Sequence, residues 1–421
     1  MEKNEKLNIL HLFKISLPNL SGYTIRSHNI LIKQKNFANP YALSSPFFLS
    51  KDKIDSIDGV YYYRYPRNTK VNLFKQSKIT DLFYFARLIN KVYFRLLKVP
   101  ISFINEIVDK KNIDLIHGCS NERFSKYGEK VAHKRGLPFI YEVRGFWEDS
   151  LVINGILKKF GYNYMKIRKK ETNLMKKADL IITLGKMMEK EIISRGISKD
   201  KIKIVPNAVD TNVFKPILPN KRLILKFKIQ GKRVIAYIGS IRKIEGIEVL
   251  IKSIKFIKEE YDNIILLLIG SISKEYKREL SKLISSLKLS DYIYFTGKVN
   301  PNEIINYYSI TEIIIIPRIK SRVNALVTPL KQLEAMAMQK VVITSDLPAL
   351  REYIKPRVSG DVFKAEDYVD LAKIIKHYLS NPELMIKLGI KARDFVKKKY
   401  EWEIVIEKYN SIYKKISDNF K

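Results

Sequence analysis

The 421-residue sequence predicts two α/β domains, each with a doubly wound parallel sheet that helices cover on both faces. Two observations carry this prediction. Short apolar runs rich in β-branched residues alternate with helical patterns along the whole chain. The alternation starts afresh after residues 205–222, a segment rich in proline and asparagine that indicates a linker. We therefore expect an N-terminal domain over residues 1–215, a C-terminal domain over residues 220–395, and a helical tail over residues 396–421.

The expected strands are the apolar runs. In the N-terminal half they lie at 7–13, 113–118, 138–143, 179–184 and 201–206, and in the C-terminal half at 233–239, 263–270, 292–297, 312–317 and 340–346. Runs that are apolar throughout are typical of parallel strands buried on both faces. In open parallel sheets, ligands bind beyond the carboxyl ends of the strands, so we expect the functional residues in the segments that directly follow these runs.

Composition narrows the class of protein. Hydrophobic residues make up 46% of the chain and aromatic residues 11%, which is enough to build large cores and argues against disorder. The single cysteine, Cys119, excludes an internal disulfide and fits a reducing cytoplasm. The first residues contain no signal-peptide h-region, and the apolar runs are too short to span a bilayer, so we expect a cytoplasmic location.

The formal net charge of +35 has two interpretations. The chain is rich in lysine, isoleucine and asparagine, as expected from AT-rich codons, and the charge then reflects composition alone. Alternatively, the charge attracts an anionic partner, which would be a lipid surface, a nucleotide or a nucleic acid. A nucleic acid is disfavoured, because the basic residues are scattered rather than gathered on one aromatic-rich face.

Two stretches, residues 78–100 and 156–179, are both basic and apolar. Interleaved apolar and basic residues are typical of a helix that lies on an anionic membrane surface. The alternative is a helix packed on the core with a solvated basic face. We favour peripheral contact with the inner face of the membrane.

A tight turn follows the first strand of the C-terminal half, in the segment YIGSIRKIEG (237–246). Gly239 lets the backbone turn and approach a ligand, and the helix that begins near Gly246 offers free N–H groups for an anion. Arg242 and Lys243 lie in the loop, where they can reach a diphosphate. The alternative is an ordinary turn with exposed basic residues.

A long loop separates the strand at 312–317 from the helix that carries Glu334, and loops of this length usually have a function. Its cations are Arg318, Lys320, Arg322 and Lys331. Glu334, the lone acid beside them, is expected at the start of the helix, where the helix dipole favours a carboxylate by about 0.5–1 kcal/mol. The functional alternative is that this carboxylate accepts both hydrogen bonds of a ribose diol while the cations hold the attached phosphates.

Polar residues also follow two strands of the N-terminal half. The segment LPNLSGYTIRSH contains Gly22, which lets the loop approach a ligand, and then Arg26 and His28, which are expected to open a helix. The segment YEVRGFWEDS is dense in polar and aromatic residues, namely Glu142, Arg144, Trp147, Glu148 and Asp149. Such loops usually serve ligands, although a salt-bridged pair beside a buried tryptophan would have the same sequence.

Four segments together resemble the family-4 retaining glycosyltransferases of the GT-B fold. They are YEVRGFWED, VPNAVDTNVF, YIGSIRKIEGIEVLI and PLKQLEAMAMQKVVITSDLPALREYI, and the resemblance extends from about residue 7 to Trp402. It is strongest to the branch associated with bacterial exopolysaccharide and exosortase gene clusters. It implies an N-terminal acceptor-binding domain, a C-terminal nucleotide-sugar-binding domain and a tail that crosses back onto the first domain. The implied reaction transfers a sugar from a UDP- or GDP-linked donor, with retention, to a glycan or lipid-linked saccharide in cell-surface polysaccharide biosynthesis.

The resemblance also implies roles for individual residues. The glutamate matching Glu334 holds the nucleotide ribose, and the residues matching Lys298 and Val299 lie by the nucleobase. The predicted nucleotide-sugar site comprises Glu334, Gly239, Ser240, Lys298, Val299, Arg318, Thr328 and Leu330. The predicted catalytic residues are Arg242, Lys331 and His117. The predicted N-terminal loop and acceptor side comprises Gly22, Arg26, Cys119, Glu142, Arg144 and Trp147.

Two departures from the family pattern concern the sugar. Leu326 stands where most relatives carry a second glutamate that touches the donor sugar. Cys119 stands where relatives often carry a second histidine, two residues after His117. These departures bear on the identity of the donor. A lone histidine after a buried strand is more often structural, which is the alternative for His117.

Two further departures concern the diphosphate. Ser240 and Glu245 stand where most relatives carry an arginine and a lysine that hold it, and we expect Arg242 and Lys331 to replace them. These cations and helix N–H groups would neutralise the departing diphosphate. The sequence has no D-x-D triplet, no cluster with metal spacing and no carboxylate pair of the glycosidase kind. We therefore expect neither a metal nor a cofactor. In the expected reaction, the acceptor attacks from the face that the diphosphate leaves, and the leaving phosphate takes the acceptor's proton.

A nonhydrolysing nucleotide-sugar epimerase is the alternative function, because it shares the two-domain fold. Such an enzyme would need paired acids in the cleft and no acceptor. Incubation of nucleotide sugars without an acceptor distinguishes the two, since only the epimerase then forms an epimer.

Overall fold

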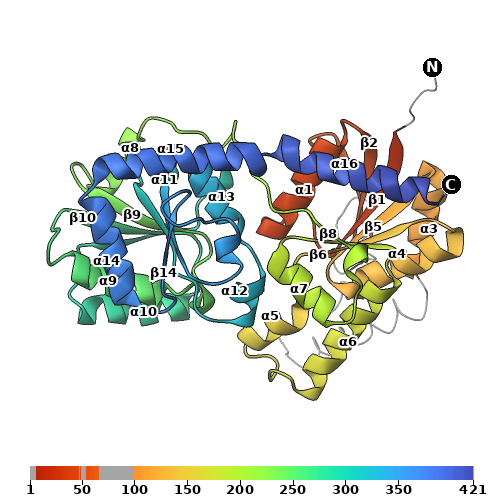
Figure 1. Cartoon of the computed structure of the whole chain (residues 1–421), viewed down its shortest axis with the longest axis horizontal. Helices are drawn as coiled ribbons and strands as arrows, with labels where there is room; N and C mark the ends of the chain where they lie inside the picture. Colours follow the sequence, from red (N-terminus) through yellow and green to blue (C-terminus); the bar gives the residue numbers. More distant parts are fainter. Residues whose placement is uncertain (1–5, 47, 49–53, 66–98, 421) are drawn as a thin grey trace, which may run out of the picture. The chain divides into compact units, whose positions relative to one another are not determined.

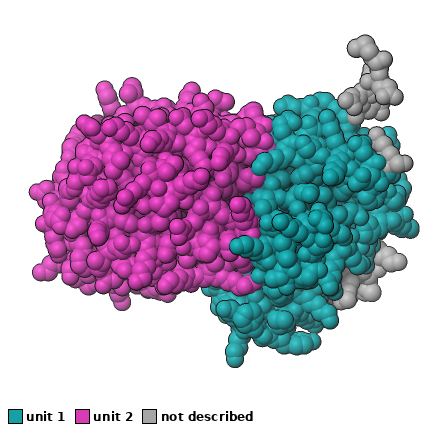
Figure 2. All heavy atoms as spheres, viewed as in Figure 1, with its two compact units in different colours: residues 1–184, 189–205, 406–421 teal, residues 185–188, 206–405 magenta. Residues whose placement is uncertain are grey.

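The computed structural model (Figure 1) describes residues 6–46, 48, 54–65 and 99–420. The chain divides into two compact units, coloured separately in Figure 2. Unit 1 contains residues 1–184, 189–205 and 406–421, and unit 2 contains residues 185–188 and 206–405. The domain roles expected from the sequence stay predictions.

Unit 1 is built on an eight-stranded sheet with the order β3-β4-β2-β1-β5-β6-β7-β8. The strands are β1 (Leu7–Phe13), β2 (Ala38–Ser44), β3 (Ile54–Ile57), β4 (Val60–Tyr63), β5 (Leu115–Cys119), β6 (Phe139–Val143), β7 (Leu180–Thr183) and β8 (Ile202–Ile204). Neighbouring strands are parallel, apart from the antiparallel pair β3–β4. Among the described residues, the helices that lie wholly or mostly in unit 1 are α1 (Gly22–Gln34), α3 (Val99–Lys111), α4 (Glu122–Arg135), α5 (Trp147–Ile153), α6 (Tyr162–Lys177), α7 (Lys186–Ser194) and α16 (Trp402–Asp418).

Helices cover both faces of the unit 1 sheet, as neighbouring residues of β1 demonstrate. His11 hydrogen-bonds to Gln34 of α1, with 2.8 Å between the two side chains. The next residue, Leu12, points to the opposite face. There it lies so close to α4 that a Cβ on Gly128 would fall 2.2 Å from its side chain. The central strands are therefore buried on both faces, as their apolar sequences predict.

Unit 2 is built on a six-stranded parallel sheet with the order β11-β10-β9-β12-β13-β14. The strands are β9 (Arg233–Ile238), β10 (Ile264–Ile269), β11 (Ile293–Gly297), β12 (Ile313–Ile316), β13 (Val341–Ser345) and β14 (Asp361–Phe363). The helices are α8 (Lys221–Phe227), α9 (Ile247–Ile257), α10 (Lys274–Ser286), α11 (Ile304–Ser309), α12 (Arg322–Leu326), α13 (Leu330–Ala337), α14 (Tyr368–Leu379) and α15 (Pro382–Lys399).

Two hydrophobic cores enclose the unit 2 sheet. Ile235 and Tyr237 of β9 belong to one core, together with apolar residues of α9, α10 and α14. The alternate residues Val234, Ala236 and Ile238 belong to the other core, with residues of α8, α11, α13 and α15. This alternation confirms the predicted doubly wound architecture in this unit.

All ten predicted strands are present. The sequence did not predict β2, β3, β4 and β14. β2 reads ANPYALS and lacks the β-branched residues of its neighbours, and β3, β4 and β14 are short strands near the sheet edges. The described helices include none that is both long and apolar enough to cross a membrane.

Candidate functional site

Two glycines bring the turn after β9 against the segment after β12. Gly246 has φ +71°, and a Cβ there would lie 1.9 Å from the carbonyl oxygen of Pro317. Gly239 has φ +140°, and a Cβ there would lie 3.0 Å from Nζ of Lys331. The left-handed backbone and the close contact both require glycine at Gly246. The carboxyl ends of β9 and β12 therefore meet at one edge of unit 2, where ligands of parallel sheets bind.

Three cations converge at this edge on one buried carboxylate, Glu245. Its Oε2 atom lies 2.8 Å from Nζ of Lys331 and 3.3 Å from Nε of Arg318. Its Oε1 atom lies 3.1 Å from a guanidinium nitrogen of Arg242. We call these four residues the Glu245 cluster. Three cations share one carboxylate, so the cluster carries two positive charges in excess.

The electrostatics of the Glu245 cluster hold its cationic side chains in place before any ligand binds. Burial alone would raise the pKa of Glu245, but the charges of Lys331, Arg318 and Arg242 lower it below its ordinary value. Burial lowers the pKa of Lys331, while Glu245 acts in the opposite direction. The Lys331 ammonium also donates to the Tyr237 hydroxyl at 2.7 Å. Lys331 is thus fixed at the turn, whereas the Arg242 side chain, although paired with Glu245, is 61% exposed and accessible from solvent.

Glu334 lies deeper in its helix than the sequence analysis expected. Helix α13 starts at Leu330, directly after Pro329, so Glu334 is its fifth residue and no acid occupies the first turn. The assignment of Glu334 as a helix-start acid is therefore wrong, because the dipole effect is confined to the first turn. The carboxylate is partly buried, which raises its pKa, and it accepts a hydrogen bond from the Tyr308 hydroxyl at 3.3 Å.

The other residues predicted for the nucleotide-sugar site differ in how far they are exposed to solvent. Ser240 and Lys298 are exposed, and Leu330 is the first residue of α13. Val299 packs against one of the unit 2 cores. Thr328 is buried, and its hydroxyl contacts the hydroxyl of Tyr353 at 3.1 Å.

In unit 1, a buried ionic network surrounds Glu142 of β6. Arg26 donates to its Oε1 at 3.1 Å, Arg144 donates to the same oxygen at 3.0 Å, and Nε2 of His117 lies 3.2 Å from Oε2. We call these four residues the Glu142 network. It extends to α16, where Arg26 donates to the Tyr409 hydroxyl at 2.9 Å.

The network contains three of the six residues predicted on the acceptor side, Arg26, Glu142 and Arg144, together with His117, which was predicted to be catalytic. Burial lowers the pKa of His117, while Glu142 acts in the opposite direction. The ring's Nδ1 lies 2.8 Å from the Tyr413 hydroxyl. Burial alone would raise the pKa of Glu142, but Arg144 and Arg26 hold it well below its usual value. The structure therefore brings Arg26, Arg144 and His117 together around Glu142. Arg26 and His117 also contact tyrosine hydroxyls of α16. Gly22 is the exposed first residue of α1.

His117, Glu142 and Cys119 are residue types that bind metals, and their ligand atoms lie within 4.8 Å of one another. The chemistry of the set does not fit a metal ion. Two guanidinium groups already neutralise Glu142, and burial raises the pKa of the Cys119 thiol to about 12, so the thiolate that a metal needs is disfavoured.

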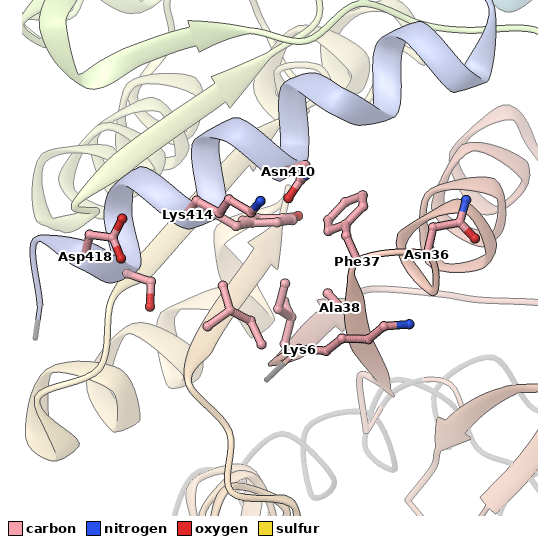
Figure 3. Close-up of a pocket in the computed structure, with 11 residues that line it drawn as sticks. Lys6, Asn36, Phe37, Ala38, Asn410, Lys414 and Asp418 are labelled. Carbon is pink, nitrogen blue, oxygen red and sulfur yellow. The ribbon is translucent and has the colours of Figure 1, made fainter. Parts of the chain in front are cut away.

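A cavity of about 390 Å³ lies elsewhere in unit 1, between α16 and the starts of β1 and β2 (Figure 3). Lys6, Asn36, Phe37 and Lys414 are among its lining residues. It opens at the amino ends of these parallel strands, opposite to the edge where ligands are expected. None of the predicted site residues lines it.

Sequence reasoning missed two features of these sites. Glu245 was noted only as a departure from the family pattern, although it is the acid that gathers the three cations. Lys14 and Arg123 were not singled out, yet both lie over the ring of Trp147. The signal for Lys14 was its position directly after the first strand.

Family models match both halves of the chain. Residues 222–395 match the model for glycosyl transferases group 1, and residues 62–213 match the model for glycosyltransferase family 4. A Methanocaldococcus jannaschii protein described as an uncharacterized glycosyltransferase is 25% identical over 58% of this chain and 60% of its own length. The capsular polysaccharide biosynthesis glycosyltransferase CapM of Staphylococcus aureus is 25% identical over 65% of this chain and 69% of its own length.

Solved structures share the fold across both units. The crystal structure of HepE from Anabaena in complex with UDP superposes with a TM-score of 0.73 at 14% identity, covering 97% of this chain and 100% of that one. At this identity the likeness shows the fold alone, and that fold is GT-B.

Proposed function

The chain belongs to the glycosyltransferases of the GT-B fold, and we propose that it transfers a sugar from a UDP- or GDP-linked donor, with retention of configuration, to a saccharide acceptor. The observation that carries the proposal is the Glu245 cluster, with its two excess positive charges at the carboxyl ends of β9 and β12. The reported complex of HepE with UDP and the roles of group 1 glycosyltransferases agree with a nucleotide-linked donor.

The cluster suits a diphosphate because its cations are held in place before a ligand arrives. Lys331 and Arg318 are fixed by Glu245, so little side-chain freedom is lost when phosphate oxygens bind. Charge develops on the diphosphate as the sugar leaves, and fixed cations stabilise that charge most strongly. In this proposal the cluster binds the donor and also assists departure of the leaving group.

Glu334 suits the ribose. Its carboxylate has the Tyr308 hydroxyl at one oxygen, which leaves acceptor capacity on both oxygens for a pair of hydroxyl groups. Its position beyond the first turn removes the structural explanation based on the helix dipole.

In this proposal the sugar keeps its anomeric configuration because the acceptor attacks from the same face that the diphosphate leaves. The family's second glutamate is replaced by Leu326, which is buried, and Glu245 is engaged by three cations. Neither residue is suited to act as a nucleophile in a double displacement. The acceptor hydroxyl would then attack from the face that the diphosphate leaves, and its proton would pass to a departing phosphate oxygen.

Thermal denaturation of the full chain with UDP, GDP and their sugars tests the donor class. A ligand at 100 times its Kd stabilises a protein by about 2.7 kcal/mol, which a melting curve resolves. We expect one nucleotide class to raise the melting temperature, and nuclear magnetic resonance of the product to show the donor's anomeric configuration. No shift with any nucleotide would refute the donor, and an inverted product would refute retention. An epimer formed without an acceptor would instead support the epimerase.

We propose that the acceptor is lipid-linked and that unit 1 contacts an anionic membrane, in cell-surface polysaccharide biosynthesis as the description of CapM suggests. Residues 150–170 contain six Lys or Arg residues and no Asp or Glu. Figure 1 shows the loop that joins α5 and α6. The same segment exposes four apolar side chains, Ile156 and Phe160 in this loop and Tyr162 and Met165 on α6. We call these four residues the α5–α6 patch. The other basic and apolar stretch lies mostly outside the described residues, over 78–98.

Cosedimentation with vesicles tests the membrane contact. Basic residues near an anionic surface contribute about 1 kcal/mol each, so binding to phosphatidylserine vesicles should exceed binding to phosphatidylcholine vesicles and weaken with salt. Ile156→Ser should reduce binding. The matched control is Ile386→Ser on α15, since both isoleucines are 64% exposed. Equal binding to both vesicle types, or equal losses in both variants, would count against the α5–α6 patch.

A further inference from the structure

Two cationic side chains and a tryptophan lie close together just after the ends of three neighbouring strands of unit 1. β1, β5 and β6 are consecutive in the sheet and parallel. Lys14 directly follows β1, Arg123 lies in the first turn of α4 after β5, and Trp147 begins α5 after β6. Nζ of Lys14 lies 3.8 Å from the centre of the Trp147 ring, and the Arg123 guanidinium carbon lies 5.9 Å from it. We call these three residues the Trp147 site.

The two cations of the Trp147 site have no bonded counter-ion within the part of the chain that the structure describes. Among the described residues, no carboxylate oxygen forms an ion pair with Lys14 or Arg123. Burial and the charge of Arg123 lower the pKa of Lys14. Glu122 is the adjacent acid, but burial raises its pKa, which weakens its value as a compensating charge.

The indole ring explains how the cations remain together in the free protein. A cation over an indole face is attracted by the electron-rich ring, and this attraction partly offsets the repulsion between Lys14 and Arg123. The indole Nε1–H is buried and has no acceptor among the described residues, so a donor is also left for a ligand oxygen or a water molecule. Two uncompensated cations and an unpaired donor at the carboxyl ends of parallel strands are the features of an anion site.

We propose that the Trp147 site binds an anionic group of the acceptor, which is a carboxylate or a phosphate attached next to the accepting sugar. This inference rests on the proposed function, in which unit 1 holds the acceptor. The shared chemistry is an oxyanion held by Lys14 and Arg123, with the amphipathic indole against the attached sugar. The anion has two sources, an acidic sugar such as a uronate or the diphosphate of a lipid carrier.

The chain offers a direct optical test, because it contains two tryptophans, Trp147 and the buried Trp402. In the Trp402→Phe variant, fluorescence reports on Trp147 alone. The full chain is first saturated with UDP, so that the donor site is filled, and then titrated with inorganic pyrophosphate, with glucuronate or with methyl glucoside. We expect one or both anions to change the fluorescence saturably and the neutral sugar to leave it unchanged. The anion that binds more tightly identifies the source.

Variants give the test its specificity. Lys14→Met and Arg123→Gln should each weaken anion binding by about tenfold, as expected when one charged hydrogen bond is lost. Lys130→Met is the control, because Lys130 is an exposed lysine on the same helix as Arg123. If Trp402→Phe does not fold, thermal shifts of the unmodified chain with the same anions replace fluorescence.

The outcomes separate this inference from the proposed donor site. Failure of UDP to bind would refute the donor proposal, whatever happens at Trp147. A fluorescence response to anions that survives in both Lys14→Met and Arg123→Gln would overturn the Trp147 site. The same conclusion follows if neither anion produces a response while UDP binds normally.

Discussion

Replacement of Glu245 by glutamine tests the charge arrangement at the edge of unit 2. The substitution keeps the shape of the side chain but raises the excess charge of the Glu245 cluster from two to three. Removal of one partner of a buried ion pair typically costs about 3–5 kcal/mol. The contacts with Lys331 and Arg318 are buried, whereas Arg242 is largely exposed and contributes little. We therefore expect a loss near the lower limit, about 3 kcal/mol.

This loss is measurable by thermal denaturation of the full chain. In a domain of this size, 1 kcal/mol corresponds to about 2–4 °C, so unit 2 should melt roughly 6–12 °C lower in Glu245→Gln. UDP should raise the melting temperature of the variant more than that of the wild type, because the diphosphate supplies the missing negative charge. If Glu245→Gln had the same melting temperature as the wild type and the same shift with UDP, the reasoning would be refuted.

The same pair of proteins has a predicted pH dependence. The folded-state pKa of Glu245 lies below its ordinary value of about 4.3, so its ionisation stabilises the folded chain at neutral pH. That contribution is fully present above the ordinary pKa and is lost as the pH falls toward the folded-state value. The difference between wild type and Glu245→Gln should therefore be constant at neutral pH and shrink in acid.

Two further predictions concern the cations and the buried network. Lys331→Met and Arg242→Ala should each lower sugar transfer at least about tenfold without unfolding the chain, and full activity in either variant would remove that cation from the diphosphate site. Glu142→Gln should destabilise unit 1 by about 3–5 kcal/mol in a melting experiment, because Arg26 and Arg144 lose their buried partner. The control Asp109→Asn, which breaks the exposed pair with Arg135, should change little, and an equally small change in Glu142→Gln would contradict the structural role of the network.

The fold was predictable because parallel strands that are buried on both faces consist of apolar residues, and such runs are visible in the sequence. β9 and β12, for example, read RVIAYI and IIII, and nothing but burial on both faces requires such runs. β2 was missed because its residues ANPYALS pair only after the strand is placed beside β1. Its strand conformation depends on tertiary contact rather than on local preference.

The site was less predictable, since its key contacts join distant residues. Lys331 and Glu245 are separated by 86 positions, and no local pattern pairs them. Arg26 and Glu142 are separated by 116. The start of α13 was predictable to within one residue, because proline favours the first position of a helix and Pro329 stands directly before Leu330. That reading would have placed Glu334 in the second turn.

Calorimetric titration of UDP and GDP into wild type and Glu334→Gln tests the central claim most directly, namely that unit 2 binds a nucleotide at the Glu245 cluster and Glu334. The control is Glu383→Gln, an exposed acid on α15. We predict that one nucleotide binds the wild type and the control equally, and binds Glu334→Gln roughly 10- to 100-fold more weakly, as expected for a lost hydrogen bond to a charged group. Equal affinity for Glu334→Gln and the wild type, or no binding of either nucleotide, would contradict the account.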